Sequence, residues 1–165
     1  MTPEDLVEIE EIKRLKYRYA RSLDTKDWDL LASCFIQNAT ASYSGGQLAY
    51  EGRDPIVGFL KKVLGSPAVL TTHFMGQPEI ELTGPSSARG TWALQDLVIF
   101  PEPAPGMNVR GASFYEDEYV NVDGEWRFKH TGYRRVWEEM QPRAADVTLT
   151  ASWWEDGGKS RIVAR

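Results

Sequence analysis

The sequence predicts an α+β fold in which helices at the N-terminal end pack on a strongly curved, mixed or antiparallel sheet and form a cone-shaped α+β barrel. Two patterns lead to this expectation. Apolar residues recur every three or four positions over residues 4–23, which indicates a helix, and they alternate with polar residues after residue 68, which indicates strands. The length of 165 residues suits one domain with a pocket inside the cone.

Three helices are expected before the long strands. The helix over residues 4–23 has an apolar face that consists of Leu6, Ile9, Ile12, Leu15, Tyr19 and Leu23. A short second helix has an apolar side made of Trp28, Leu31, Ala32 and Phe35. Asp54-Pro55 starts the third helix, because a capping side chain followed by proline is typical of a helix N-terminus. The apolar face of this helix consists of Ile56, Phe59, Leu60 and Val63.

A hairpin and five longer strands are expected from the alternating segments. Residues 39–43 and 47–50 flank the hairpin signal Ser44-Gly45-Gly46. The later strands cover residues 69–75, 78–83, 88–100, 109–122 and 125–137, with turns at 83–86 and 123–124 and a loop at 101–106. We assign residues 1–140 to one domain. Residues 141–165 are expected to form a tail that docks, through Trp153 and Trp154, on the barrel or on a neighbouring subunit.

The composition excludes several classes of function. A net charge of −5 and a pI of about 5.1 argue against nucleic-acid binding, which needs a basic face. No apolar run approaches the roughly 20 residues of a membrane span, and residues 1–11 lack the order of a signal peptide, so we expect a cytoplasmic protein. Six Trp, seven Tyr and six Phe favour a pocket for a ring-shaped hydrophobic ligand.

His73 is the first candidate for chemistry, because histidine titrates near neutrality and the chain has only two. The other is His130, and the two are not at the spacing of a zinc site. Cys34 is alone, which excludes an intrachain disulfide. No glycine-rich phosphate cradle follows a strand. We therefore expect neither a metal nor an organic cofactor.

Several motifs resemble the SnoaL-like group of the nuclear transport factor 2-like superfamily, a cystatin-like fold. Tyr-x-x-x-x-Asp ends the first helix at residues 19–24, and Asp-Trp-Asp follows at 27–29. Further matches are Gly-Arg-x-x-Ile at 52–56, Thr-x-His-x-x-Gly at 71–76, the aromatic strand at 90–96 and the last strand at 124–128. The resemblance covers roughly residues 5 to 140 and implies the same cone-shaped fold.

The resemblance also implies five site residues. Within the group, residues 42–46, 114–119 and 131–139 are similar to bile-acid 7α-dehydratases, whose proposed active-site positions fall on Tyr19, Asp24, His73, Asp96 and Arg135. Lindane dehydrochlorinases share the Asp24 and His73 pair, and scytalone dehydratases also eliminate water. The chain departs from the dehydratases at Arg134 and at His130.

The implied activity is that of a cofactor-independent lyase, a dehydratase. In this hypothesis His73 is the general base, Asp24 fixes its tautomer, and Tyr19 donates to the leaving hydroxyl or to an oxyanion. Asp96 and Arg135 form a second acid–base group and its charge partner. The residues expected to bind the substrate are Tyr43, Phe74, Trp92 and Tyr115.

The expected substrate is a hydroxylated hydrophobic cyclic compound, such as a steroid or bile-acid-like 7-hydroxy-3-oxo-4-ene compound, either free or as a coenzyme A thioester. A ketosteroid-isomerase-like isomerase and a polyketide cyclase are alternatives on the same scaffold, and so is a non-catalytic ligand-binding domain. The resemblance further implies a homotrimer assembled through the outer face of the sheet.

Simpler interpretations of the same residues remain open at this point. Asp24 can be the N-cap of the helix that starts at Trp28. His73 can be an ordinary strand residue and Tyr19 an ordinary packing residue. A bulge can turn Asp96 outward to solvent. Arg135 can pair with an acidic residue on a neighbouring strand, Glu116 or Glu118, and His130 is expected at the surface.

Overall fold

The computed structural model describes residues 1–103 and 105–162. Its helices are α1 (Pro3–Asp24), α2 (Trp28–Ser33), α3 (Arg53–Leu64) and α4 (Trp153–Asp156), with a short 3-10 turn, η1 (Ser44–Gly46). Its strands are β1 (Phe35–Tyr43), β2 (Leu48–Glu51), β3 (Leu70–Gly84), β4 (Ser87–Phe100), β5 (Met107–Val122) and β6 (Glu125–Pro142). Residue 104 of the expected loop and residues 163–165 of the expected tail lie outside the described part.

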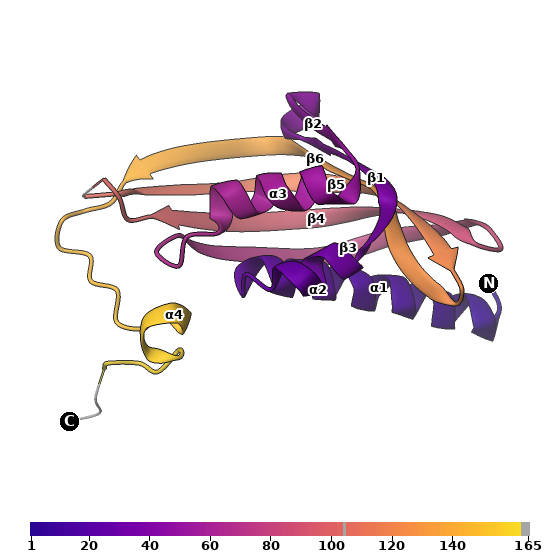
Figure 1. Cartoon of the computed structure of the whole chain (residues 1–165), viewed down its shortest axis with the longest axis horizontal. Helices are drawn as coiled ribbons and strands as arrows, with labels where there is room; N and C mark the ends of the chain where they lie inside the picture. The colour runs from indigo at the N-terminus through magenta and orange to yellow at the C-terminus, as the bar shows by residue number, and fades with distance from the viewer. Residues whose placement is uncertain (104, 163–165) are drawn as a thin grey trace.

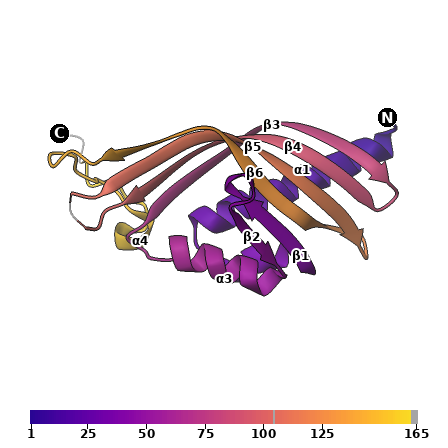
Figure 2. The ribbon, with the colours of Figure 1, turned by 90° about the horizontal axis from the view of Figure 1, so that it is seen from above.

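The six strands form one mixed sheet in the order β2-β1-β6-β5-β4-β3. Strands β3 to β6 are consecutive antiparallel neighbours, whereas β1 pairs with β6 in parallel and with β2 in antiparallel orientation (Figure 1). The sheet bends into an arch with α3 beneath it (Figure 2). This arrangement confirms the predicted α+β class and the helices packed on a curved sheet.

The core lies between the helices and the inner face of the sheet. Its largest fully buried apolar and aromatic side chains are Ile12, Leu15, Tyr19, Leu23, Leu31, Phe35, Tyr43, Ile56, Trp92, Tyr119 and Phe128. The predicted apolar face of α1 supplies four of these, but Leu6 at its exposed N-terminal end does not join the core. Burying a large apolar side chain stabilises a fold by about 1.5–3 kcal/mol, so this aromatic-rich layer dominates the packing.

Two helix boundaries differ from the prediction. The N-cap of α3 is Gly52 rather than Asp54, and no side chain caps this helix. Gly52 has a φ of 93°, which a residue with a side chain rarely adopts. The predicted second helix ends earlier than expected, because Phe35 already begins β1. Asp27, not Asp24, caps α2 by accepting a hydrogen bond from the Leu30 amide at 3.0 Å.

The strands are longer than predicted. The expected strands 69–75 and 78–83 form the single strand β3, whose pairing is interrupted between Gly76 and Glu79, where Gln77 has a φ of 48°. Strand β6 continues to Pro142, although residues 138–142 show no clear alternation in the sequence. The hairpin around Ser44-Gly45-Gly46 is confirmed by the antiparallel pairing of β1 and β2.

Two bulges in β6 decide which of its side chains face the helices. The pairing with β5 shifts between Phe128 and His130 and again between Arg135 and Trp137. Each bulge adds one residue without a partner, so the inward positions change from even to odd numbers and then back. The inward-facing residues along β6 therefore include Trp126, Phe128, Thr131, Tyr133, Arg135 and Glu138.

Candidate active site

Asp24, the last residue of α1, joins the end of this helix to strand β3. Its Oδ1 accepts hydrogen bonds from the Thr71 hydroxyl and from His73 Nδ1, each at 2.7 Å, and its Oδ2 accepts the His73 backbone N–H at 2.9 Å. The negative end of a helix dipole disfavours a carboxylate at this position. Three donors offset that effect, because hydrogen bonds to an ionised group are stronger than those between neutral groups.

The contact with Asp24 fixes the tautomer of His73. An ionised carboxylate only accepts hydrogen bonds, so Nδ1 carries the proton and Nε2 of a neutral ring keeps its lone pair. The His73 side chain is 9% exposed and Asp24 is 26% exposed. The pair is therefore held in place while remaining partly open to solvent. This is the arrangement in which a carboxylate orients an imidazole base.

Asp96 lies directly opposite His73 on the neighbouring strand β4 and faces inward. Both of its oxygens receive the Arg135 guanidinium, with Nη1 to Oδ1 at 2.5 Å and Nη2 to Oδ2 at 2.9 Å. Arg135 Nη1 also donates to the Ser113 hydroxyl at 3.1 Å. Burial alone lowers the pKa of Arg135, but the hydrogen bonds and charge of Asp96 outweigh burial and raise this pKa above its ordinary value.

A glycine makes room for this ion pair. Gly111 on β5 lies between Asp96 on β4 and Glu138 on β6. A Cβ atom at Gly111 would come within 2.8 Å of Arg135 Nη1 and 2.7 Å of the Trp137 carbonyl oxygen. Arg135 can therefore reach across β5 only because position 111 has no side chain. Glu138 Oε2 is 2.8 Å from Arg135 Nε, an ion contact whose angle makes no hydrogen bond.

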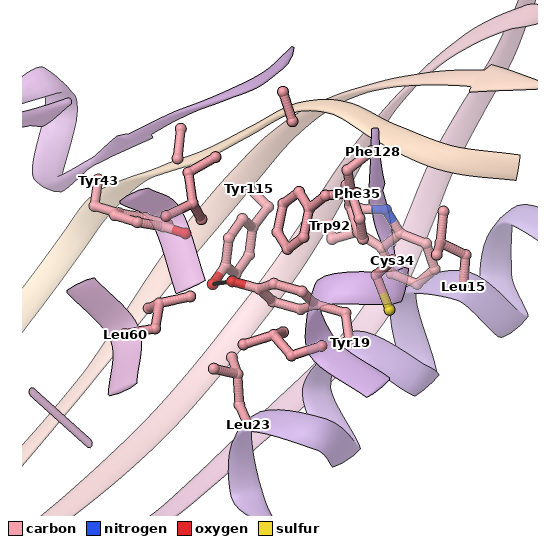
Figure 3. Close-up of a cluster of buried hydrophobic side chains, with 14 of the residues drawn as sticks. Leu15, Tyr19, Leu23, Cys34, Phe35, Tyr43, Leu60, Trp92, Tyr115 and Phe128 are labelled. Atoms are coloured by element: carbon pink, nitrogen blue, oxygen red, sulfur yellow. Dashed lines mark hydrogen bonds between the residues drawn. The ribbon is translucent and has the colours of Figure 1, made fainter. Parts of the chain in front are cut away.

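Three tyrosine hydroxyls gather deeper in the core. The hydroxyls of Tyr19 and Tyr115 are 3.5 Å apart, and the buried Tyr43 hydroxyl has no hydrogen-bond partner. Figure 3 shows the Tyr19 and Tyr115 hydroxyls meeting, with the Tyr43 hydroxyl on the same side of the cluster and Leu60 beside them. Burial raises the pKa of all three phenols well above the ordinary value of 10.0, so each remains a donor at neutral pH.

Tyr133 connects the tyrosine cluster to the charged residues. Its ring lies 5.5 Å from that of Tyr115 and 5.7 Å from that of Tyr43, and the Arg135 guanidinium carbon is 4.9 Å from its centre. The five residues implied by the resemblance are thus linked through direct neighbours on the inner face of one sheet. Asp24 and His73 pair with each other, Asp96 and Arg135 pair with each other, and Tyr19 joins the tyrosines.

A second polar cluster lies at the other end of the core. Lys16 and Asp117 form a fully buried ion pair at 2.7 Å, and both side chains are 0% exposed. Asp117 also accepts the Tyr119 hydroxyl at 2.8 Å and the Thr131 hydroxyl at 2.7 Å. Trp92, predicted to bind the substrate, belongs here, because its Nε1 donates to the Tyr119 hydroxyl at 2.8 Å. We call these five residues the sealed cluster.

The structure corrects Phe74 and decides several open interpretations. Phe74 lies on the opposite face of β3 from His73 and is 66% exposed, because neighbouring strand residues point to opposite faces. It therefore does not share a site with His73. Asp24 is not an N-cap, and Asp96 is not turned outward by a bulge. Arg135 pairs with neither Glu116, which contacts Arg134, nor Glu118, which contacts Lys129.

Sequence reasoning missed Thr71, Gly111, Ser113, Tyr133 and Glu138 at this site. Gly111 had a usable signal, because a glycine inside a strand often marks a close approach of another group. The inward orientation of Tyr133, Arg135 and Glu138 depends on the two bulges of β6. The alternation of polar and apolar residues alone does not reveal these bulges. Thr71 faces the same side of β3 as His73, since the two are separated by one residue.

Other features of the described residues lie outside this site. His130 Nδ1 is 2.7 Å from the Thr40 hydroxyl on the neighbouring β1. A hollow of about 1220 Å³ is lined mainly by outward-facing residues of β3 to β6, including Glu79, Arg89 and Glu116, and by no predicted site residue. Within residues 1–103 and 105–162, no helix is both long and apolar enough to cross a membrane.

Comparisons with known proteins identify the family of this chain. The family model of the SnoaL-like domain matches residues 4–132. Scytalone dehydratase arp1 of Aspergillus fumigatus is 26% identical over 139 residues, which cover 79% of this chain and 83% of the relative.

Two solved structures extend the comparison. One, from Novosphingobium aromaticivorans and provisionally described as a scytalone dehydratase, has a TM-score of 0.77 at 24% identity and covers 92% of this chain and 95% of its own. The other, a type 2 hexachlorocyclohexane dehydrochlorinase (LinA), has a TM-score of 0.74 at 19% identity and covers 85% and 93%. At these identities the two structures establish the shared fold.

Proposed function

The chain belongs to the SnoaL-like domain family, and from this premise we propose that it is a cofactor-independent lyase that eliminates water from a hydroxylated hydrophobic cyclic substrate. The dehydratase relative in Aspergillus fumigatus supports a lyase of this general class. The observation that carries the proposal is the contact of His73 Nδ1 with Asp24 at 2.7 Å. It leaves Nε2 as the basic atom of a partly exposed imidazole.

His73 is the general base in this proposal. Its Nε2 takes a proton from the carbon that joins the hydroxyl-bearing carbon to the activating carbonyl group or, in the vinylogous case, to the enone, and Asp24 stabilises the imidazolium that forms. The C–O bond to the neighbouring hydroxyl breaks, and in net terms the abstracted proton and the hydroxyl leave as water. A positioned base contributes about 10²–10⁴-fold to such a step.

The tyrosine cluster supplies the hydrogen-bond donors. Tyr19 donates to the leaving hydroxyl or to the developing enolate oxygen, and Tyr115 and Tyr43 line the same space. The unpartnered Tyr43 hydroxyl supports this role, because a buried polar group without a partner is costly unless a ligand satisfies it. Leu60 of α3 lies beside these hydroxyls (Figure 3).

Asp96 and Arg135 have a positioning role rather than an acid–base role. Arg135 occupies both carboxylate oxygens of Asp96, which leaves Asp96 poorly placed to exchange protons. This pairing weighs against an isomerase in which Asp96 is the base. The guanidinium instead fixes the side chain of Asp96, the residue directly opposite His73 on the neighbouring strand.

The proposed substrate class is a steroid-like 7-hydroxy-3-oxo-4-ene compound. Rings of Tyr19, Tyr43, Tyr115 and Tyr133 form a wall that suits a flat polycyclic ligand. The hydroxyl at position 7 and the extended enone give the β-hydroxy carbonyl pattern, through its vinylogue, that elimination requires.

An ultraviolet assay tests the proposal. Wild type, His73→Ala and His130→Ala are mixed with a 7α-hydroxy-3-oxo-4-ene steroid, and formation of the extended dienone is followed. We expect turnover by wild type and by His130→Ala, and a loss of roughly 10²-fold or more in His73→Ala with unchanged circular dichroism. No turnover by wild type contradicts the steroid substrate. An equal loss in the two histidine variants contradicts the role of His73.

We also propose that the chain assembles as a homotrimer through the outer face of its sheet. Three large apolar side chains are exposed there, Phe74, Phe114 and Trp137, and contiguous exposed apolar residues often mark an interface. Multi-angle light scattering should give three times the 18.7 kDa of the chain, and Phe114→Arg should yield smaller species. A wild-type monomer at micromolar concentration would contradict the trimer.

A further inference from the structure

Lys16 is placed directly against one ring of the tyrosine cluster. Its Nζ lies 3.4 Å from the centre of the Tyr115 ring, compared with 5.1 Å for Tyr19 and 5.3 Å for Phe128. A cation over an aromatic face is attracted by the electron density of the ring, most strongly where water is excluded. Lys16 is fully buried, so this contact is not screened by solvent.

The partner of Lys16 is Asp117, two residues after Tyr115 on β5. Asp117 accepts Lys16, Tyr119 and Thr131, so its charge is shared among three donors of the sealed cluster. The carboxylate lies 2.7 Å from the ammonium, and the ammonium itself contacts the Tyr115 ring. Tyr115 therefore experiences the positive end of a buried ion pair.

The Tyr115 hydroxyl points to the candidate active site, not to the ion pair. It lies 3.5 Å from the Tyr19 hydroxyl, and its ring contacts the ring of Tyr133, which in turn touches Arg135. Tyr115 is thus the one described tyrosine that meets both the ammonium of the sealed cluster at close range and the hydroxyl of Tyr19.

We propose that Lys16 is a positioning residue for Tyr115: its ammonium stabilises negative charge on the phenol ring and makes the Tyr115 hydroxyl the strongest hydrogen-bond donor of the site. This rests on the proposed function, in which the tyrosine hydroxyls receive the oxygen of the substrate. As that oxygen gains negative charge, the phenol shares its proton more fully, and the ring charge that results faces Lys16. Tyr115 then joins Tyr19 in the catalytic machinery.

Burial opposes this effect, and the balance is measurable. Burial raises the pKa of Tyr115 well above 10.0, Tyr43, Tyr133 and Asp117 raise it further, and the hydrogen bond with Tyr19 lowers it. The ammonium acts in the opposite sense to burial on the same ring. Because the ammonium contacts the Tyr115 ring directly, its effect should exceed that of the Asp117 carboxylate, so removing both charges should raise the pKa of Tyr115 further.

A titration that needs no substrate tests the inference. Residue 115 is replaced by 3,5-difluorotyrosine, whose phenol ionises at lower pH than tyrosine, and its ¹⁹F resonance is followed with pH. The wild-type background is compared with Lys16→Met/Asp117→Asn, because the Asn oxygen can still accept the Thr131 hydroxyl, its NH2 group can donate to the Tyr119 oxygen, and neutral replacements of buried ion pairs are usually tolerated. We expect the pKa at position 115 to rise by about one unit in the double variant.

Matched controls separate this effect from a general change in structure. The same fluorinated residue at Tyr50, on β2, should titrate alike in both backgrounds. Lys13→Met removes a partly exposed lysine from the same helix and should leave position 115 unchanged. An unchanged or lowered pKa at position 115 in the double variant overturns the inference, as does a phenol that never ionises in the folded wild-type background.

A second readout distinguishes the inference from the proposed function. On the steroid substrate, Lys16→Met/Asp117→Asn should lower kcat by roughly 10-fold with little change in KM, and should cause no further loss in a Tyr115→Phe background. Equal losses in both backgrounds overturn the role of Lys16 and leave the dehydratase proposal standing. No turnover by wild type sinks the dehydratase proposal, while the ¹⁹F titration still judges Lys16.

Discussion

Two aspartates in this protein each accept three hydrogen bonds, yet they have opposite access to solvent. Asp24 receives the Thr71 hydroxyl and two N–H groups of His73 and is 26% exposed. Asp117 receives Lys16, Tyr119 and Thr131 and is fully buried. The number of donors is the same, so what differs is the route by which a proton can arrive or leave.

This difference separates a reactive site from a fixed charge. A partly exposed imidazole beside an ionised carboxylate can exchange protons with a substrate and with water. A sealed ion pair cannot do so without exposing a charge in the core, where desolvation is costly. The following predictions test whether the two aspartates divide these tasks.

The largest effect is expected when Asp24 loses its charge. Asp24→Asn should lower kcat/KM by about 10²–10⁴-fold, because an amide neither enforces the Nδ1–H tautomer of His73 nor stabilises the imidazolium. The free energy of unfolding should fall by only about 1–2 kcal/mol, since the one oxygen of Asn still accepts some of the three hydrogen bonds that Asp24 receives. Steady-state kinetics and urea unfolding check both halves. Near wild-type activity would show that Asp24 is only structural.

Unfolding at alkaline pH tests whether the buried tyrosine hydroxyls in and around the sealed cluster stay protonated in the folded protein. Burial raises the pKa of Tyr19, Tyr43, Tyr115 and Tyr119 above the ordinary 10.0, so the folded state holds protons that the unfolded state releases. Stability is therefore fully present below pH 10 and is lost as pH rises above it. At pH 11 each tyrosine lowers the free energy of unfolding by up to about 1.4 kcal/mol, roughly 6 kcal/mol for the four.

Absorbance of phenolate near 295 nm gives the measurement for this prediction. If the four phenols are sealed, their absorbance should appear together with the loss of near-ultraviolet circular dichroism. Phenolate that forms gradually while the fold persists would show instead that water reaches these hydroxyls in the native state.

Replacing aspartate by asparagine in the sealed cluster should lower the free energy of unfolding instead of the activity. Asp117→Asn leaves Lys16 as an unpaired buried cation, which costs about 3–5 kcal/mol. Urea unfolding should show this loss, and Lys16→Met/Asp117→Asn should recover most of it. If Asp117→Asn is as stable as wild type, the ion pair is not buried in solution and the contrast with Asp24 fails.

The smallest effect concerns the glycine beside Arg135. Gly111→Ala should cost about 1–3 kcal/mol, because the added carbon meets the Trp137 carbonyl oxygen and displaces the guanidinium. Thermal unfolding and kcat/KM measure the two consequences. Gly58→Ala is a control, since nothing lies within 4 Å of a Cβ at that position. Equal stability of the two variants would mean that Arg135 does not need the space over β5.

Periodicity and motifs predicted much of this molecule from the sequence. The alternating pattern after residue 68 located the long strands, and the resemblance identified the Asp24, His73, Asp96 and Arg135 group that the fold brings together. Such inferences succeed where one face of an element is buried and its period is regular. The predicted start of the third helix at Asp54 was wrong, because the N-cap is Gly52 and glycine has no side chain that could signal a cap.

The sealed cluster could not be predicted in this way. Lys16 lies on a helix with many charged residues, and its neighbours Lys13 and Arg14 form ordinary surface contacts with acidic residues. Only the position of Asp117, 101 residues later, reveals that this lysine is buried. The prediction that Phe74 binds the substrate was wrong for a related reason. Phe74 is next to His73 in the sequence, so its side chain lies on the other face of the strand.

The two bulges of β6 limit where residues can be inserted or deleted in this chain. Six residues, 130–135, stand between them, and this short segment contains both Thr131 of the sealed cluster and Arg135 of the candidate active site. Deleting a residue inside this segment, such as Gly132, would leave Thr131 beside Asp117 but turn Arg135 to the outer face while keeping every strand intact. Relatives that conserve this chemistry should therefore place their gaps in the turns and almost never between these two bulges.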